Sequence, residues 1–300
     1  MAAKRNRPLI GIFWMLTTGI FFVAVTALVK TMGDRIPPVE AAFLRYVLGL
    51  AFLIPMLAQV RRTKLTRRLW TLSATRGAAH SGGVCLWFFA MTQIPIADVT
   101  AMNYLAPVYV TVLAAIFLGE RLAARRIAAV VVALIGAMVI LRPGIREVDP
   151  GHIAMLFCAV IFAVGYLLAK ILADEVPAAV VVFMLSIFVP LFLTPFAIAS
   201  WITPTWEELG LLFLVACFAT AGHYTMTLAF AAAPVSVTQP VTFLQLVWAT
   251  LLGALVFAEP IDIWVIFGGG MILAAVSFIT WREAVLKRQP VTPASPATKL

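Results

Sequence analysis

The sequence predicts an all-α integral membrane protein with ten transmembrane helices, arranged as two inverted repeats of five helices each. Three observations lead to this fold class: an extreme apolar composition, a regular series of apolar segments, and a unit of sequence that occurs twice. Of the 300 residues, 63% are hydrophobic and only 12% are charged. Because a soluble domain is about half apolar and about a quarter charged, most of this chain requires a lipid bilayer as its solvent.

Ten apolar segments follow one another along the chain, most of them close to the ~20 residues that a helix needs to cross a bilayer. The first segment is too long for the apolar part of a signal peptide, so we interpret it as an uncleaved span. Short loops with proline and glycine turn signals separate the segments. The predicted spans are residues 9–31, 38–59, 71–93, 99–118, 125–141, 152–172, 178–202, 209–232, 237–257 and 263–281.

The repeated unit is an apolar helix that ends at an acid and is followed by one more apolar helix. Residues 97–122 and 236–261 share this pattern, and a displacement of 139 positions brings Glu120 onto Glu259. Since each half has an odd number of spans, the second half enters the membrane from the opposite side, which makes the repeat inverted. We therefore divide the chain into a first repeat (1–145), a second repeat (146–282) and a polar, proline-containing cytoplasmic tail that we expect to be disordered (283–300).

Lysine and arginine are distributed unevenly between the two sides of the predicted spans. With the N-terminus in the cytoplasm, sixteen basic residues fall in cytoplasmic segments and four in outside segments. This bias follows the positive-inside rule and predicts that both termini are cytoplasmic. Arg45 and Arg76 lie within spans, and we interpret both as reaching lipid headgroups. The net charge of +9 is thus explained by membrane topology, so we expect no nucleic-acid partner.

The acid that ends the fourth span of each half occurs in FLGERL, Phe117–Leu122, and in VFAEP, Val256–Pro260. Together with ten spans in two repeats, these motifs resemble the drug/metabolite transporter (DMT) superfamily, EamA type, over about residues 8–282. The resemblance implies a multi-pass carrier in the bacterial inner membrane with a central cavity between the halves. YddG-like exporters of aromatic amino acids have a similar pattern, as do carriers of S-adenosylmethionine and riboflavin.

One departure from the family pattern concerns the helix hinges. The family often has a proline thirteen residues before the acid, and Pro107 occupies that position in the first half. Leu246 occupies it in the second half, where the nearest proline is Pro240. We therefore expect the second hinge to lie nearer the cytoplasm than its counterpart. Glu120 and Glu259 are interpreted as structural, because an acid at a helix junction stabilises the N-terminus of the helix that follows.

Polar side chains at the depth of a bilayer are energetically costly, so they are our candidates for a binding site. His80 lies near the middle of the third predicted span and His223 near the middle of the eighth. The displacement of 139 positions maps His223 onto position 84, one helical turn from His80. We interpret this pair as part of a cavity lining, with a hydrogen bond between helices as the alternative. Trp87, on the same helix face, would either stack on a substrate ring or pack in the core.

Single polar stripes run along the fourth and ninth predicted spans, and such stripes face the interior of a helix bundle. The alternative role is hydrogen bonding between helices, worth only ~0.6 kcal/mol on average in membranes. The amides of Asn103 and Gln245 have more hydrogen-bonding capacity than packing requires, which favours a cavity. The complete candidate set for substrate binding is His80, Trp87, Asn103, Tyr104, His223, Tyr224, Thr242, Gln245 and Trp14.

Several kinds of chemistry have no counterpart in the sequence. No Asp or Glu lies in the middle of a predicted span, and carboxylates are the usual proton or sodium relays of coupled pumps, so we expect transport down the substrate gradient. There is no P-loop to bind ATP. Cys85, Cys158 and Cys217 each lie in an apolar span, which predicts neither a disulfide nor a metal site. We expect no catalytic residues, no metal and no cofactor.

The leading hypothesis is a secondary transporter of small organic metabolites, with alternating access around a midplane cavity. An exporter or facilitator of amino acids, aromatic or otherwise apolar, is the favoured substrate assignment. The alternatives are an uptake carrier for S-adenosylmethionine, riboflavin or another metabolite, an intramembrane enzyme, and a structural or receptor membrane protein. The expected partners are a small-molecule substrate and the lipid bilayer, and the expected assembly is a monomer or homodimer.

Overall fold

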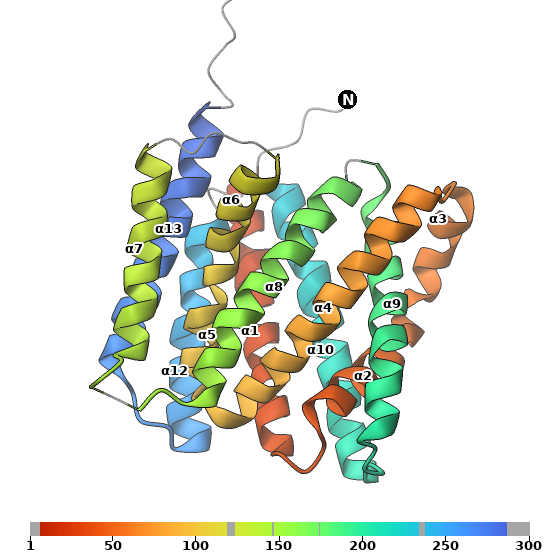
Figure 1. Ribbon diagram of the computed structural model, residues 1–300, viewed down its shortest axis with the longest axis horizontal. Coiled ribbons are helices and arrows are strands. Elements are labelled where there is room, and N and C mark those ends of the chain that lie inside the picture. The colour runs from red at the N-terminus through yellow and green to blue at the C-terminus, as the bar shows by residue number, and fades with distance from the viewer. Residues whose placement is uncertain (1–6, 119–123, 146, 174, 234–237, 287–300) are drawn as a thin grey trace, which may run out of the picture.

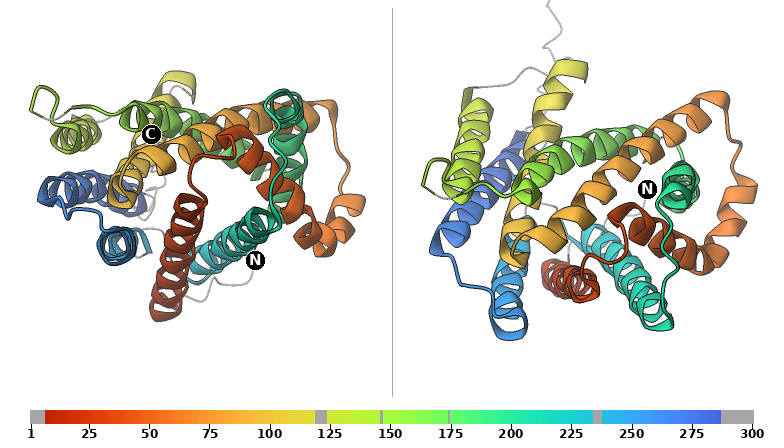
Figure 2. Two further views of the ribbon diagram at one scale, coloured as in Figure 1. Left: turned by 90° about the horizontal axis from the view of Figure 1, so that it is seen from below. Right: turned by 60° about the horizontal axis from the view of Figure 1, so that its bottom comes forward.

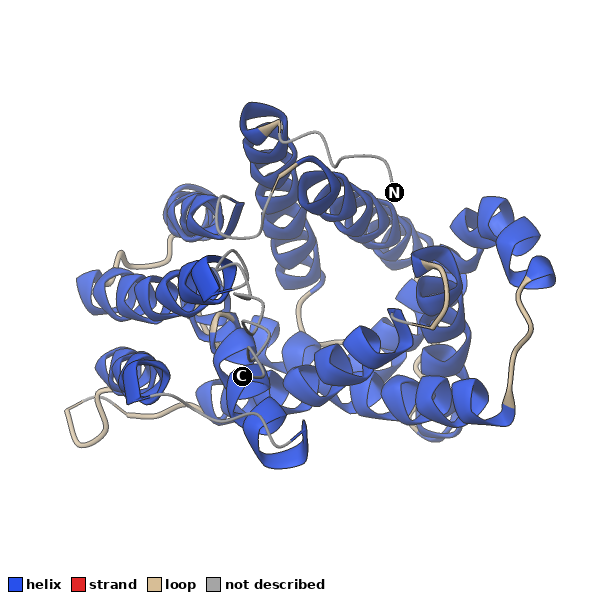
Figure 3. Ribbon diagram, turned by 90° about the horizontal axis from the view of Figure 1, so that it is seen from above, coloured by secondary structure: helices blue, strands red, loops and turns tan. Residues whose placement is uncertain are grey.

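The computed structural model describes residues 7–118, 124–145, 147–173, 175–233 and 238–286. Within these ranges the chain consists of helices joined by short loops, without a strand, which confirms the all-α prediction (Figure 3). The elements are α1 (Pro8–Met32), α2 (Pro38–Gly49), η1 (Leu50–Met56), α3 (Leu57–Arg62), α4 (Arg67–Gln93), α5 (Ile96–Asn103), α6 (Leu105–Leu118), α7 (Ala124–Leu141), α8 (Pro150–Ala173), α9 (Ala178–Ala199), α10 (Trp206–Ala232), η2 (Gln239–Thr242), α12 (Phe243–Phe257) and α13 (Ile263–Leu286).

Seven helical segments of the described chain are long and apolar enough to cross a membrane. Three of the ten predicted spans, residues 38–59, 71–93 and 237–257, are not among them. The first is divided into α2, the 3₁₀ segment η1 and α3, and the last begins with the 3₁₀ segment η2. The middle one, α4, contains polar residues such as Arg76 and His80, which lower its hydropathy. The seven segments are Pro8–Met32, Ile96–Leu113, Ala124–Leu141, Pro150–Leu168, Ala179–Ala199, Trp206–Met226 and Ile263–Arg282.

The fourth predicted span is not one helix but two, because α5 and α6 meet at Tyr104. Pro107 explains this break: proline has no N–H to donate, and its ring clashes with the carbonyl four residues earlier, that of Asn103. In the second half, η2 contains Pro240 and leads into α12 at Phe243. Phe243 is 139 positions after Tyr104, so the two breaks correspond. The 3₁₀ segment itself, residues 239–242, corresponds to residues 100–103, so the irregular backbone of the second half begins on the side of the break at which the second hinge was expected.

The helices of the two halves of the chain interleave (Figures 1 and 2). α1 packs along α10, and α4 packs along α8. α7 and α13 lie side by side at one edge of the bundle, and α2 packs against α9 at the opposite edge (Figure 1). The α7–α13 crossing is close, since a Cβ added to Gly136 would lie 2.7 Å from the carbonyl oxygen of Gly268. Small residues at such a crossing let two backbones approach within a membrane.

The two ends of the bundle differ in their loops. The loops at residues 33–37, 94–95, 142–145, 147–149, 200–205 and 258–262 gather at one end, opposite the end at which the chain enters α1 (Figure 1). We call this the ion-paired end, for contacts described below. The tail predicted for residues 283–300 begins within α13, which continues to Leu286, and its residues 287–300 lie outside the described part of the chain.

Candidate functional site

His80 lies at the middle of α4, where it contacts two other helices. Its Nε2 is 2.7 Å from the hydroxyl oxygen of Tyr46 on α2, and either group can donate this hydrogen bond. Its ring stacks on Phe162 of α8, with ring centroids 5.1 Å apart. His223 of α10 acts on His80 electrostatically, so the structure brings together the two histidines that the sequence paired. Both roles considered for His80, packing and lining, therefore have a structural basis.

Two arginines that sequence analysis did not include in the site surround this histidine pair. Arg45 and Arg76 both act electrostatically on His80 and on His223. The guanidinium carbon of Arg45 is 4.4 Å from the ring centroid of Tyr46, a cation–π distance. Their signal was present in the sequence, because they are the two basic residues that the charge count assigned to neither side of the membrane.

Arg76 is held by protein groups and not by a lipid headgroup, which corrects its predicted role. Its Nη1 donates a hydrogen bond of 3.0 Å to the carbonyl oxygen of Val181 on α9. Its Nε is buried and has no hydrogen-bond partner among the described residues. The hydroxyl groups of Tyr46 and Tyr166 act on its charge.

Tyr166 of α8 completes this group, and its side chain is partly exposed. Its ring lies beside that of Phe162, and it interacts electrostatically with Arg76 and Tyr46. Nevertheless, 47% of its surface is exposed, and His223 is exposed as well. Its polar side chains and this partial exposure make the group a candidate ligand site. We call the group the interior cluster: Arg45, Tyr46, Arg76, His80, Tyr166 and His223.

A second group of predicted residues gathers where the broken helices α5 and α12 pack together. The hydroxyl of Tyr104 donates a 2.7 Å hydrogen bond to the carbonyl oxygen of Thr242, so the two helix breaks are joined directly. The Oδ1 atom of Asn103 is buried and has no hydrogen-bond partner in the described part of the chain. Gln245 lies against α1, where a Cβ added to Gly19 would be 3.5 Å from the Cβ of Gln245. We call this the helix-break group: Asn103, Tyr104, Thr242 and Gln245.

The remaining three predicted residues join neither group through a contact in the described structure. Trp87 is half-buried on α4, packs on the main hydrophobic core and contacts the ring of Phe88. Tyr224 is 64% exposed and follows His223 on α10. Trp14 is half-buried on α1 and contacts the ring of Phe13 on the same helix.

At the ion-paired end, Glu259 connects three segments. It forms an ion pair with Lys30 at the end of α1, and its Oε2 accepts a 3.0 Å hydrogen bond from the backbone N–H of Ile96. The predicted capping function is therefore present, but Glu259 stabilises the N-terminus of α5 in the other half of the chain, not that of the helix that follows it. Lys30 also donates to the carbonyl oxygen of Ile94 at 3.2 Å. Glu120, its counterpart in the sequence, lies outside the described residues.

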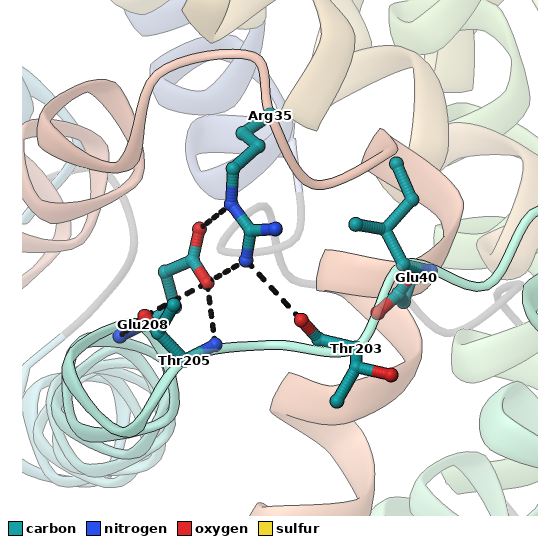
Figure 4. A network of polar contacts seen from close by, with 6 residues as sticks. Arg35, Glu40, Thr203, Thr205 and Glu208 are labelled. Atoms are coloured by element: carbon teal, nitrogen blue, oxygen red, sulfur yellow. Dashed lines mark hydrogen bonds and ion pairs between the residues drawn. The ribbon is translucent and has the colours of Figure 1, made fainter.

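Arg35 and Glu208 form a second connection at this end (Figure 4). The Nε of Arg35 donates a 2.6 Å hydrogen bond to Glu208 Oε1, and this bond is the main cause of a raised pKa for Arg35. Glu208 also accepts from the backbone N–H of Thr205 at 2.7 Å, as part of a capping box that begins α10. Nearby, Glu40 accepts a 2.9 Å hydrogen bond from the backbone N–H of Ile202.

Two further pairs complete the ion-paired end. Asp98 Oδ2 lies 2.7 Å from His152 Nε2, and both side chains are buried. Arg142 pairs with Asp262. A cavity of about 400 Å³ opens beside His152, and none of the predicted site residues lines it. In the described ranges, no group of three or more His, Cys, Asp or Glu side chains is placed to hold a metal ion.

Known families and proteins resemble this chain over almost its whole length. The model of the EamA-like transporter family matches it twice, over residues 9–142 and 149–281. A riboflavin transporter of Rhizobium johnstonii is 28% identical, over 97% of this chain and 97% of its own length. An S-adenosylmethionine uptake transporter of Rickettsia prowazekii is 25% identical, over 91% of this chain and 93% of its own. The pseudopaline exporter CntI of Pseudomonas aeruginosa is 25% identical, over 88% of this chain and 94% of its own length.

A solved structure also resembles this one. A crystal structure with 21% sequence identity superposes with a TM-score of 0.59 and covers 94% of this chain and 98% of its own. At this identity the likeness shows a shared fold.

Proposed function

Because the chain belongs to the EamA-like transporter family of the drug/metabolite transporter superfamily, we propose that it is a secondary transporter that moves a small organic metabolite by alternating access. The observation that carries this proposal is the double match of the family model, one match in each half of the chain. Two structurally related halves that bind a substrate between them are the usual basis of alternating access in secondary transporters.

Helix packing supports an inverted repeat of five spans in each half. We count α2–η1–α3, α5–α6 and η2–α12 as one span each, which gives ten. In this numbering, α1 is the first span and α10 the eighth, and the two pack on each other. Their counterparts in the opposite halves, α8 and α4, pack on each other in the same way. Three other spans pack on their own counterparts: α2 on α9, α5 on α12, and α7 on α13. A twofold axis that relates the two halves produces this pattern of contacts, and with five spans in each half that axis would lie in the membrane plane. The pattern supports the proposed division into a first repeat (1–145) and a second repeat (146–282).

The proposed substrate site lies between the interior cluster and the helix-break group. Both contain polar side chains from spans of the two halves, at positions where such groups are costly. Phe162 adds aromatic surface beside His80. Pockets for small molecules are mostly apolar with a few orienting polar groups, and this composition matches that description.

Two substrate classes follow from different observations. The aromatic side chains and the amides of Asn103 and Gln245 favour an amino acid with an aromatic or apolar side chain, released from the cell. The names of the relatives favour a carrier of riboflavin or S-adenosylmethionine working in uptake, with an exporter of pseudopaline as a further precedent. Neither class involves an enzymatic step, and we propose transport without one.

The membrane orientation that we propose has both termini in the cytoplasm, so that the ion-paired end faces outward. To test it, single cysteines are introduced at Arg62 and at Ile145, which is exposed in the loop after α7, in a variant without the three native cysteines. An impermeant maleimide added to intact cells is expected to label Ile145→Cys and not Arg62→Cys. Labelling at Arg62→Cys alone would reverse the orientation.

Transport itself is tested with purified protein in proteoliposomes. Labelled L-phenylalanine, L-tryptophan, riboflavin and S-adenosylmethionine are each offered with and without the same solute inside, beside protein-free liposomes. We expect saturable exchange of at least one solute, with no accumulation when only a pH gradient is imposed, because the described acids lie near helix ends. If these solutes and then pooled metabolites all fail to exchange, the proposed function is rejected.

A further inference from the structure

Five arginines of the described chain differ in the kind of partner that they have. Arg35, Arg68 and Arg142 each form an ion pair with a carboxylate. Arg45 and Arg76 have no carboxylate partner in the part of the chain that the structure describes. Arg45 lies over the ring of Tyr46, and Arg76 donates a hydrogen bond to the carbonyl of Val181, with Tyr46 and Tyr166 acting on its charge.

Two uncompensated positive charges inside a membrane protein are energetically costly. Arginine stays protonated at every physiological pH, so neither side chain can become neutral to reduce this cost. A buried charge without a countercharge is strongly unfavourable, and an unsatisfied buried donor such as Nε of Arg76 adds to it. Ionisable residues kept at such positions mark ligand or ion pathways.

The neighbours of the two arginines indicate what would neutralise them. Tyr46 and Tyr166 offer hydroxyl donors, and His80 and His223 offer ring nitrogens. Among the described residues, Arg45 and Arg76 act electrostatically on both His80 and His223. A site with positive charge, several hydrogen-bond donors and aromatic walls fits an anion that is attached to an apolar or aromatic body.

We propose that the interior cluster binds the carboxylate or phosphate group of an organic anion, and that this anion is the transported solute. Arg45 and Arg76 supply the charge, and the hydroxyls of Tyr46 and Tyr166 supply hydrogen bonds. This inference rests on the proposed function and narrows its substrate class to organic anions.

Matched pairs of solutes test the proposal on the unmodified protein. The purified transporter, in a detergent without phosphate, is titrated with 3-phenylpropionate or 3-phenylpropionamide, indole-3-acetate or its amide, and riboflavin 5′-phosphate or riboflavin. Thermal unfolding reports binding. In at least one pair, the acid is expected to stabilise the protein at a roughly 10- to 100-fold lower concentration than its neutral partner, as one charge-assisted hydrogen bond implies. Equal or weaker effects of every acid would overturn the proposal.

Variants on one helix locate the effect. Arg76→Gln is expected to abolish the preference for the acid, while Arg76→Lys retains part of it because the charge remains. Arg68→Gln is the matched control, since Arg68 lies on the same helix but pairs with Glu175. Loss of the preference in Arg68→Gln to the same extent would reject the assignment to Arg76. If Arg76→Gln does not fold, the lysine variant and the matched pairs still decide.

A lipid headgroup is the other source of the same anionic chemistry, so phosphatidylglycerol is titrated in a separate arm. Stabilisation by this lipid that depends on Arg76, with none by the soluble acids, would assign the cluster to lipid and overturn the proposal. The transport assay separates this inference from the proposed function. Exchange of neutral solutes that is unchanged in Arg76→Gln rejects the anion site alone, whereas anion binding without any exchange rejects transport alone.

Discussion

The ion-paired end and the interior cluster both contain basic side chains, but only those of the ion-paired end meet carboxylates. Lys30, Arg35 and Arg142 pair there with Glu259, Glu208 and Asp262. Each of these pairs joins the first half of the chain to the second. In the interior cluster, Arg45 contacts an aromatic ring and Arg76 a backbone carbonyl instead. The comparison separates charges that hold the two halves together from charges that remain for a ligand.

This difference has a mechanical consequence under the proposed function. Alternating access requires the two halves to move relative to each other around a fixed site. The contacts at the ion-paired end would have to break for that end to open, and the joined helix breaks of Tyr104 and Thr242 lie between it and the substrate site. Removing a charged side chain from the ion-paired end should therefore reduce the stability of the protein, whereas removing one from the interior cluster should reduce transport.

The largest effect on stability is expected for Glu259→Ala. The side chains of Lys30 and Glu259 are only 21% and 10% exposed, and the change leaves Lys30 without its countercharge and the N–H of Ile96 without its acceptor. We expect a loss of about 3 kcal/mol in the free energy of unfolding, measured in detergent. The double variant Lys30→Met with Glu259→Leu should recover part of it, because no buried charge remains unpaired. A single variant as stable as wild type would contradict the structural role of this pair.

The next largest effect, on transport and not on stability, is expected for His80→Ala and Gln245→Ala. Each removes a side chain from one of the two groups that border the proposed site. We expect the exchange rate in proteoliposomes to fall about tenfold, which corresponds to about 1.4 kcal/mol, while thermal stability and expression hold. Glu259→Ala provides the opposite pattern as a reference. If both interior variants transport like wild type, the substrate does not bind at this site.

How far the sequence could predict this structure depends on the kind of signal. The all-helical fold follows from the apolar composition and the regular series of apolar segments, whereas a fixed displacement between the halves brings His223 only to within one turn of His80. The break at Tyr104 was not predicted as a change of helix, although Pro107 supplies its cause. The ion pairs were not predicted because they join residues more than a hundred positions apart, such as Lys30 and Glu259. Periodicity within one helix contains no information about such partners.

Arg76 illustrates the remaining limit. Its position within a span was visible in the sequence, but a long basic side chain can reach a headgroup as readily as it can turn inward. The deciding facts are the bond to Val181 on α9 and the buried Nε, and both depend on how α4 and α9 pack. A basic residue within a span is therefore a better candidate for a binding site when the basic residues of the adjacent loops already account for the positive-inside bias.

An intermediate effect is expected for Tyr104→Phe, which removes only the hydroxyl that joins the two helix breaks. The lost hydrogen bond to the carbonyl of Thr242 is worth about 1 kcal/mol, so a correspondingly small loss of thermal stability should follow. Because the contact joins α5 to η2, it would also resist motion between the halves, and the exchange rate is expected to change more than the stability does. Tyr109→Phe, five residues further along the chain on α6, is the control. Equal effects of both variants on exchange would argue against a specific role for the Tyr104 contact.

The smallest effect is expected for the pair at the opposite end of the bundle, Arg68 and Glu175, whose side chains are 64% and 30% exposed. Exposed ion pairs gain little because water and salt screen them, so Glu175→Gln should cost about 0.5 kcal/mol or less, and the cost should disappear in high salt. Glu259→Ala should keep most of its cost under the same salt, since its partners are shielded from solvent. Measuring both variants at low and high salt therefore tests whether burial, and not charge alone, distinguishes the ion-paired end. A salt-sensitive loss of similar size in both would remove that distinction, and with it the reason to treat the cross-half pairs as what holds that end closed.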